Sequence, residues 1–151
     1  MRSLKYVFLL LVCLAAIPAI AQIEDPTTWR YEVKKKSATE YTLIFHLSIK
    51  EKWHIWSMKP GGDGMLIAPS FVFDVNKKIT LKGKVSEKGK VVTTAMDGID
   101  GKVNYLSGKV DYSVDIAVTG PVKITGKHTY QVCNDQTCLA PTDKDFVFEI
   151  K

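Results

Sequence analysis

Apolar and polar residues alternate with a period of two over most of the chain that follows Thr27. Such alternation places one face of a β-strand against a core and the other face in water. Each clear run is therefore predicted to be a strand. The apolar positions of these runs are Tyr41, Leu43, Phe45, Leu47 and Ile49; Phe71, Phe73 and Val75; Val110, Tyr112, Val114, Ile116 and Val118; and Phe146, Phe148 and Ile150.

Clusters of turn-forming residues separate the runs, and no segment has the apolar stripe of an amphipathic helix. About eight or nine short strands with regular turns are typical of an all-β antiparallel sandwich. The chain has no internal repeat and no visible domain boundary, so one sandwich domain is predicted. The predicted turns are Gly61-Gly62-Asp63-Gly64, Asn76-Lys77-Lys78, Ser86-Glu87-Lys88-Gly89, Ser107-Gly108 and Gly120-Pro121.

Residues 1–21 have a different pattern, which is that of a secretory signal. Arg2 and Lys5 precede an apolar run, and Ala19-Ile20-Ala21 has the small residues that signal peptidases prefer. We predict a cleavable signal peptide over 1–21 and an exported domain over 22–151. No other stretch is long and apolar enough to span a bilayer, so the exported product is expected to be soluble.

The charge of the exported chain does not indicate nucleic-acid binding. Loss of Arg2 and Lys5 lowers the formal net charge from +5 to +3, and Arg30 is then the only arginine. Nucleic-acid sites usually gather positive charge in a patch that includes arginine. Here the lysines are spread among acidic residues, which is typical of a solvated surface.

Cleavage of the signal would leave two cysteines, Cys133 and Cys138, with four residues between them in the stretch YQVCNDQTCLAP. An exported chain can form a disulfide, because its compartment permits one. Asn134 and Asp135 favour a turn, and Pro141 biases its predecessor toward extended geometry. We expect the cysteines to face each other across a tight connection between the last two strands, at an accessible end of the sandwich.

Three interpretations of this pair are open from the residues alone. The chain could be a non-catalytic binding or adaptor sandwich whose disulfide only stabilises the fold, although a ring this short restricts the unfolded chain by just about 2 kcal/mol. The disulfide could instead be opened and closed, since exposed or strained disulfides are the ones that exchange. The third interpretation is a metal site.

The metal interpretation lacks a full set of ligands. Two thiolates leave a zinc site incomplete, and no histidine is close to them in sequence. Copper would require methionines together with His54. The methionines form no repeated motif and are more typical of core filling. The residues considered were His46, His54, His128, Met58, Met65 and Met96.

Two stretches resemble a known family. EKWHIWSMKPGGDGMLIAPSFVF, from Glu51 to Phe73, combines a Trp-His-hydrophobic-aromatic-Ser segment with a Gly/Pro-rich loop and an aromatic strand. YQVCNDQTCLAPTDKDFVFEI, from Tyr130 to Ile150, has a tyrosine-led strand with two nearby cysteines. Together they resemble the N-terminal periplasmic domain of the thiol:disulfide interchange protein DsbD, in order along the whole exported chain.

The resemblance implies an immunoglobulin-like sandwich in the periplasm with a redox-active cysteine pair. Cys138 would bond to the partner protein and Cys133 would be its intramolecular mate. Electrons would come from a thioredoxin-like protein served by a membrane electron carrier, which must be a separate protein if the chain ends at Lys151. The acceptors would be periplasmic protein disulfides, such as those of disulfide isomerases and cytochrome c maturation factors. No metal or organic cofactor is implied.

Family members also have a cap loop over the cysteine pair. The matching stretch here is AMDGIDGK, from Ala95 to Lys102, with Met96, Asp97 and Ile99 as the candidate cap residues. Family caps can present an aromatic ring, so Met96 or Ile99 would have to shield the pair here. Some members also have five residues between the cysteines, whereas this chain has four.

Other side chains could contribute to the cysteine site, and each has two interpretations. Trp53, His54 and Trp56 could form a docking surface, but packing at the end of a strand is favoured for them. Basic groups at Lys127 or His128 could lower a thiol pKa, whereas carboxylates would raise it. The carboxylates considered were Asp135, Asp143 and Asp145. The sequence does not determine which of these groups face the cysteines.

Overall fold

The structure is a computed structural model that describes residues 25–151. The predicted signal peptide over 1–21 lies outside the described residues. Within them the chain forms strands and no helix, and nothing is long and apolar enough to be a membrane-spanning helix. The strands are β1 (Thr27–Lys35), β2 (Glu40–Ile49), β3 (His54–Gly61), β4 (Ser70–Phe73), β5 (Ile79–Leu81), β6 (Ser86–Ala95), β7 (Lys102–Val118), β8 (Val122–Tyr130), β9 (Val132–Cys133) and β10 (Thr142–Ile150).

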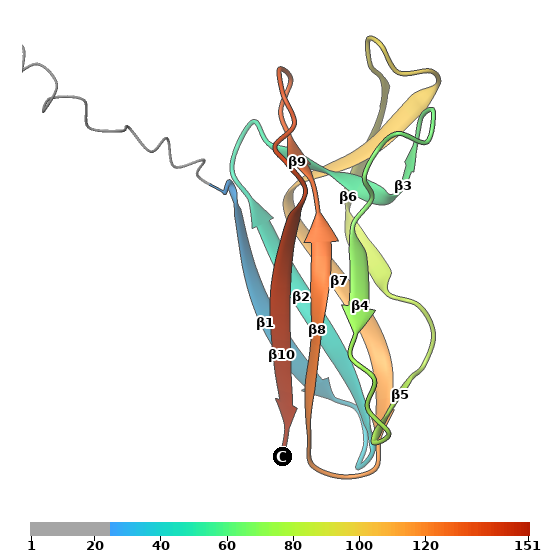
Figure 1. The fold of residues 1–151 in the computed structure, drawn as a ribbon, viewed down its shortest axis with the longest axis vertical. Coiled ribbons are helices and arrows are strands. Elements are labelled where there is room, and N and C mark those ends of the chain that lie inside the picture. The colour runs from blue at the N-terminus through green and yellow to red at the C-terminus, as the bar shows by residue number, and fades with distance from the viewer. Residues whose placement is uncertain (1–24) are drawn as a thin grey trace, which may run out of the picture.

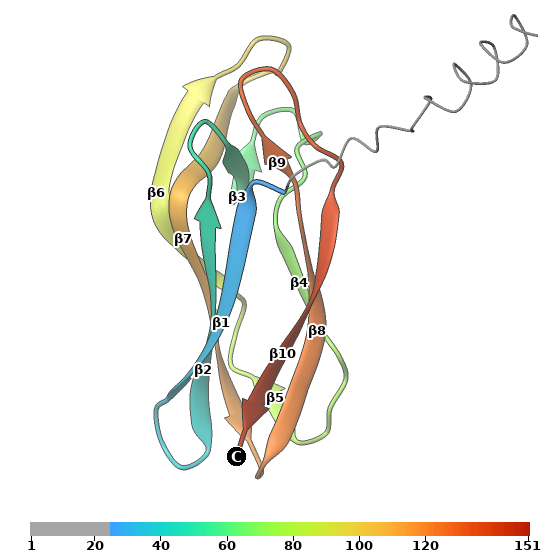
Figure 2. The same cartoon turned by 90° about the vertical axis from the view of Figure 1, so that its left-hand side faces the viewer.

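The strands form two antiparallel sheets that pack face to face (Figures 1 and 2). The larger sheet has seven strands in the path β1-β2-β7-β3-β9, with β5 and β6 also paired to β7. The smaller sheet has the order β10-β8-β4. The all-β, immunoglobulin-like sandwich expected from the sequence is therefore confirmed.

Alternating apolar residues of both sheets fill the space between them. Leu43 lies opposite Val114 and Phe45 lies opposite Tyr112 in the β2–β7 ladder, and all four are buried. Phe146 and Phe148 of β10 approach Phe45 from the other sheet, with ring centroids 4.9 and 5.1 Å away. These are the positions that the period-two pattern predicts to be inside. Val75 is the exception: β4 ends at Phe73, and Val75 is fully exposed.

Two of the predicted turns are wrong, because their glycines lie within paired strands. Ser86–Gly89 is the first part of β6, and Ser107-Gly108 lies within β7. The register between these strands shifts from Gly89↔Val110 to Val91↔Leu106, so β7 carries extra residues there. Gly108 has a φ of 71°, a left-handed conformation that glycine adopts without steric cost. The turn-forming residues therefore make a β-bulge that bends β7 without ending it.

The chain changes sheet just before the cysteines. Tyr130 ends β8 in the smaller sheet, whereas Val132 pairs with Ile55 of β3 in the larger sheet. Tyr130 is buried, and its hydroxyl donates a 2.9 Å hydrogen bond to Asp25, which also accepts a 2.6 Å bond from Lys144. These contacts hold the crossing point against the start of β1 and place β9 at the end of the sandwich opposite the C-terminus (Figure 2).

Candidate functional site

Cys133 and Cys138 form a disulfide at this end of the sandwich. Their Cα atoms are 4.0 Å apart, and the two residues form an isolated antiparallel bridge. The side-chain oxygen of Asn134 accepts hydrogen bonds from the backbone amides of Gln136 and Thr137, at 2.9 and 2.8 Å. The tight turn expected between the cysteines is therefore present, and it is built around Asn134.

The two ends of the disulfide differ in exposure. Cys133 is 1% exposed, because β9 lies against β3 and neighbouring side chains cover it. Cys138 is exposed, since it follows the turn and belongs to no strand. Cys138 is therefore the end of the disulfide that lies open at the surface of the domain, whereas Cys133 is enclosed.

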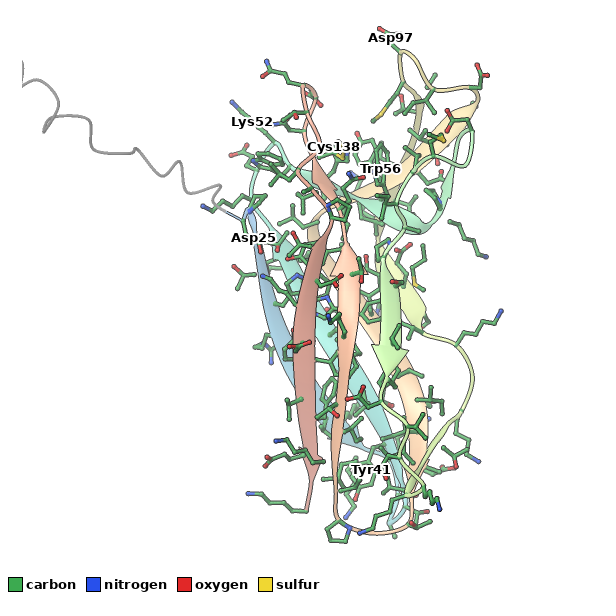
Figure 3. All side chains as sticks on the ribbon, in the orientation of Figure 1. Asp25, Tyr41, Lys52, Trp56, Asp97 and Cys138 are labelled. Carbon is green, nitrogen blue, oxygen red and sulfur yellow. A yellow bond between two sulfur atoms is a disulfide. The ribbon has the colours of Figure 1, made fainter. Side chains whose placement is uncertain are left out.

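Cys133 belongs to a small apolar cluster on the face of the larger sheet that points away from the main core. Its buried members are Trp56, Val103 and Cys133. Along β3, Ile55 points into the main core while Trp56 points into this cluster, as strand alternation requires. Figure 3 shows Trp56 and Cys138 at the same end of the molecule. We call these three residues and the side chains packed on them the cysteine cluster.

The predicted cap loop lies against this cysteine cluster. The loop joins β6 to β7, and Met96 and Ile99 are both half-buried against the cluster. The Ile99 side chain also packs near Gly62, which follows β3. A Cβ atom added at Gly62 would lie 3.0 Å from Cγ2 of Ile99. Asp97 is exposed at the tip (Figure 3). Met96 and Ile99 therefore pack against the cluster that contains Cys133, while Cys138 is exposed.

The aromatic segment before this loop is buried. Trp56 is 3% exposed and His54 5% exposed, whereas Trp53 is half-buried against the main core. The packing interpretation of these three residues is therefore confirmed over the docking interpretation. His54 has a position of particular interest, because it pairs directly with Cys133 across the β3–β9 ladder.

Most of the charged groups considered from the sequence are engaged elsewhere. Lys127 forms a 3.4 Å ion pair with Asp143 on the smaller sheet. His128 is buried in the main core, 2.8 Å from the Tyr31 hydroxyl, and burial together with nearby Lys144 lowers its pKa to about 4. Asp135 lies in the turn between the cysteines, where its charge acts on His54.

Metal ligands do not converge in the part of the chain that the structure describes. Residues 25–151 contain no group of three or more His, Cys, Asp or Glu side chains placed to hold an ion. Met58 packs on the main core, Met96 packs on the cysteine cluster, and Met65 is 81% exposed. His46 is held between Glu32 and Asp111, at 3.0 and 2.7 Å. The absence of a metal or organic cofactor stays a prediction.

Sequence reasoning missed Val103 and Tyr105 as parts of the cysteine cluster. Val103 is fully buried there, and Tyr105 packs beside it. The turn predicted at Ser107-Gly108 separates these residues from the strand predicted over Val110 to Val118. The alternating pair Val103 and Tyr105 was the available signal, and it becomes visible once a bulge is allowed in β7.

The family comparison matches nearly the whole of the described chain. The family described as thiol:disulfide interchange protein DsbD, N-terminal, matches residues 21–150. A search of curated proteins finds no match. The family match includes both cysteines, the cap loop and the aromatic segment of β3.

Two solved structures share the fold. The N-terminal periplasmic domain of ScsB from Proteus mirabilis aligns with a TM-score of 0.64 at 14% identity, covering 85% of this chain and 48% of that one. The N-terminal domain of Neisseria meningitidis DsbD, in the reduced form, aligns with a TM-score of 0.53 at 14% identity, covering 80% and 84%. This chain thus spans about half the length of the ScsB chain that it matches.

Proposed function

The chain belongs to the family of DsbD N-terminal domains, and from that premise we propose that it is an exported module that relays electrons between proteins by thiol–disulfide exchange. Cys133 and Cys138 would alternate between the dithiol and the disulfide. The observation that carries the proposal is the asymmetry of the pair. Cys138 is an exposed residue, and Cys133, to which it is bonded, is buried.

This asymmetry suits a two-step exchange. During reduction of the module, a donor thiolate attacks the Cys138 sulfur, forms a mixed disulfide and releases Cys133 as a thiolate. The second donor thiol then attacks the mixed disulfide and releases Cys138, so that the donor leaves oxidised. Reduction of an acceptor runs in the opposite sense: Cys138 attacks the acceptor disulfide, and Cys133 then attacks Cys138 to release the acceptor as a dithiol.

The cap loop would limit which molecules react. Met96 and Ile99 pack against the cluster that contains Cys133, where they would restrict the access of water and small thiols to Cys133 more than to Cys138. A docking partner would reach Cys138 past the rim of the loop. Asp97 is exposed at the tip of the loop, where it would face an approaching protein and would not shield the cysteines.

The partners follow from the chemistry of exchange and from the family. The donor would be a thioredoxin-like protein supplied by a separate membrane electron carrier, and the acceptors would be periplasmic proteins with disulfides. The matched domain of ScsB is described as periplasmic, and the matched domain of DsbD has been solved in its reduced form. Both descriptions support a compartment and a chemistry of this kind for the present chain.

A redox titration tests the proposal. The pair is equilibrated with thiol–disulfide buffers, and its state is measured by alkylation and mass spectrometry. A relay predicts a potential within the span of known exchange proteins, roughly −120 to −270 mV. A potential below about −300 mV would indicate a disulfide that only stabilises the fold.

The same titration is followed by a transfer experiment. Reduced thioredoxin-like protein should open the Cys133–Cys138 bond, with the two proteins passing through a mixed disulfide. The Cys138→Ser variant is the matched control, because it keeps the buried cysteine and removes the exposed one. Inertness of the wild-type disulfide toward every thioredoxin-like donor offered would contradict the relay.

A further inference from the structure

His54 lies directly across the β3–β9 ladder from Cys133. Directly opposed residues of antiparallel strands point to the same face, with Cβ atoms about 4.5 to 5.5 Å apart. Both side chains are enclosed, since His54 is 5% exposed and Cys133 1% exposed. The imidazole and the sulfur therefore share one small region of the domain.

One nitrogen of the His54 imidazole has no hydrogen-bond partner among the described residues. Its ring packs 5.2 Å from the Trp56 ring and 4.5 Å from the Tyr105 ring, measured between centroids. The Nε2 atom is buried and makes no hydrogen bond to any of residues 25–151. Buried polar atoms nearly always make a hydrogen bond. A buried Nε2 atom without one, beside a cysteine pair that can be reduced, suggests that its partner forms only when the disulfide opens.

Opening the disulfide creates a polar group in this place. Cys133 becomes a thiol or a thiolate inside a cluster formed by Trp56, Val103 and aliphatic side chains. An uncompensated charge is costly in such surroundings, so Cys133 needs a nearby group with which to exchange a proton. His54 is the histidine that the β3–β9 pairing places opposite it.

We propose that His54 is the proton-transfer partner of Cys133 in thiol–disulfide exchange. The inference rests on the proposed function, and it adds a role for a residue outside the cysteine pair. In the step that releases a reduced acceptor, His54 takes the proton of the Cys133 thiol. The Cys133 thiolate attacks Cys138, the bond between Cys138 and the acceptor breaks, and the acceptor sulfur leaves as a thiolate.

The proton then passes from the imidazolium to the departing thiolate or to water. In the opposite direction, a donor thiolate attacks Cys138, the Cys133–Cys138 bond breaks, and the Cys133 thiolate receives a proton that the neutral His54 ring relays from water. Each direction transfers two electrons between the module and its partner, and His54 ends each cycle in the state in which it began.

The electrostatic surroundings of His54 agree with this role. Burial lowers its pKa from the ordinary value of 6.5, and the charge of Asp135 partly opposes that effect. The titratable groups that face the imidazole are Asp135 from the turn, Tyr105 from β7 and Cys133 from β9. The imidazole is therefore neutral at neutral pH and has a nitrogen free to accept a proton.

An aromatic disulfide reagent, dithiobis(nitrobenzoate), separates the two sulfur steps. Reduced protein releases one coloured thiolate when exposed Cys138 attacks the reagent, and a second when Cys133 resolves the mixed disulfide. In His54→Phe, which keeps a packed ring and removes the nitrogens, we expect the second phase to slow on the order of tenfold to a hundredfold. The first phase should change by less than about twofold, since His54 acts on Cys133 alone.

The pH profile distinguishes proton transfer from packing. In the wild type, the second phase should rise with pH through the pKa of His54, below 6.5. In His54→Phe it should rise only at the higher pH where the Cys133 thiol ionises by itself. His46→Gln, a histidine change on another part of the larger sheet, is the control and should leave both phases unchanged. Equal rates and equal pH profiles for wild type and His54→Phe would overturn the proposal.

A second measurement needs no variant, in case His54→Phe does not fold. Titration of the wild-type His54 ring by NMR should give different pKa values in the disulfide and the dithiol forms. The dithiol value should be lower, because a thiol that donates to Nε2 favours the neutral ring. An unchanged value would refute the inference. Because the reagent and the NMR titration involve no protein partner, they fail or succeed independently of the relay itself.

Discussion

Cys133 and Cys138 are joined by one covalent bond, yet Cys133 is enclosed at 1% exposure while Cys138 lies on the surface. The difference arises because Cys133 ends a strand paired to β3, whereas Cys138 follows the turn at Asn134. In the proposed exchange, a partner therefore attacks the exposed Cys138. This difference in exposure sets the order in which the proposed exchange makes and breaks its bonds.

Trapping experiments should follow that order. In Cys133→Ser, the exposed Cys138 can form a mixed disulfide that no internal thiol resolves, so a stable adduct with a thioredoxin-like protein is expected on non-reducing gels. In Cys138→Ser, the remaining thiol is buried, and adduct formation should be at least about tenfold slower. Equal trapping by both variants would mean that the burial of Cys133 does not control access.

The cap loop should slow reaction of the disulfide with small reagents. Replacing both Met96 and Ile99 with Ala removes the part of the aliphatic packing on the cysteine cluster that the loop supplies. Reduction by a small dithiol should then become several times faster, as followed by quenched-flow alkylation. Asp97→Ala is the matched control in the same loop, and its rate should equal that of the wild type because Asp97 is exposed at the tip. No acceleration in the double variant would show that the loop does not shield the pair.

Gly126 should be required for packing of the smaller sheet. A Cβ atom there would collide with the Val72 carbonyl oxygen and with the Phe146 ring. Because the first obstacle is backbone, Gly126→Ala is expected to lower the free energy of unfolding by about 1 to 3 kcal/mol. Chemical denaturation measures this. Lys127→Ala, at the exposed neighbouring position, is the control and should change the free energy of unfolding by less than about 0.5 kcal/mol. An equally small change in Gly126→Ala would contradict the steric explanation.

Protonation of His128 should make the domain less stable in acid. Burial, together with Lys144, lowers its pKa to about 4 in the folded state, from an ordinary value of 6.5. The unfolded chain therefore binds the proton first, and stability falls as the pH drops from 6.5 toward 4, then no further from this group. The loss is on the order of 3 kcal/mol.

His128→Phe isolates this contribution from that of the other titrating groups. The variant keeps an aromatic ring beside Trp29, whose ring centroid is 4.1 Å from that of His128. The free energy of unfolding is measured across this pH range for both proteins. The variant should lose less stability than the wild type on acidification, and parallel curves would rule out His128 as the source.

The local pattern of residues was sufficient to predict the class of fold. Period-two alternation identified the buried faces of β2, β7 and β10, because each side chain's face follows from its place in the strand. It also predicted a tight turn between the cysteines, since Asn134 bonds within its own turn. It was wrong at Ser107-Gly108, because a glycine signals a left-handed conformation without indicating whether the chain turns or bulges.

The sequence by itself thus determined a stranded domain with two cysteines held across a short turn. Only the tertiary structure decided that β9 leaves the sheet of β8 and pairs with β3. That pairing buries one cysteine, exposes the other and places His54 opposite Cys133. Alternation specifies which face of a strand is buried, but the choice of partner strand depends on packing between segments far apart in the chain.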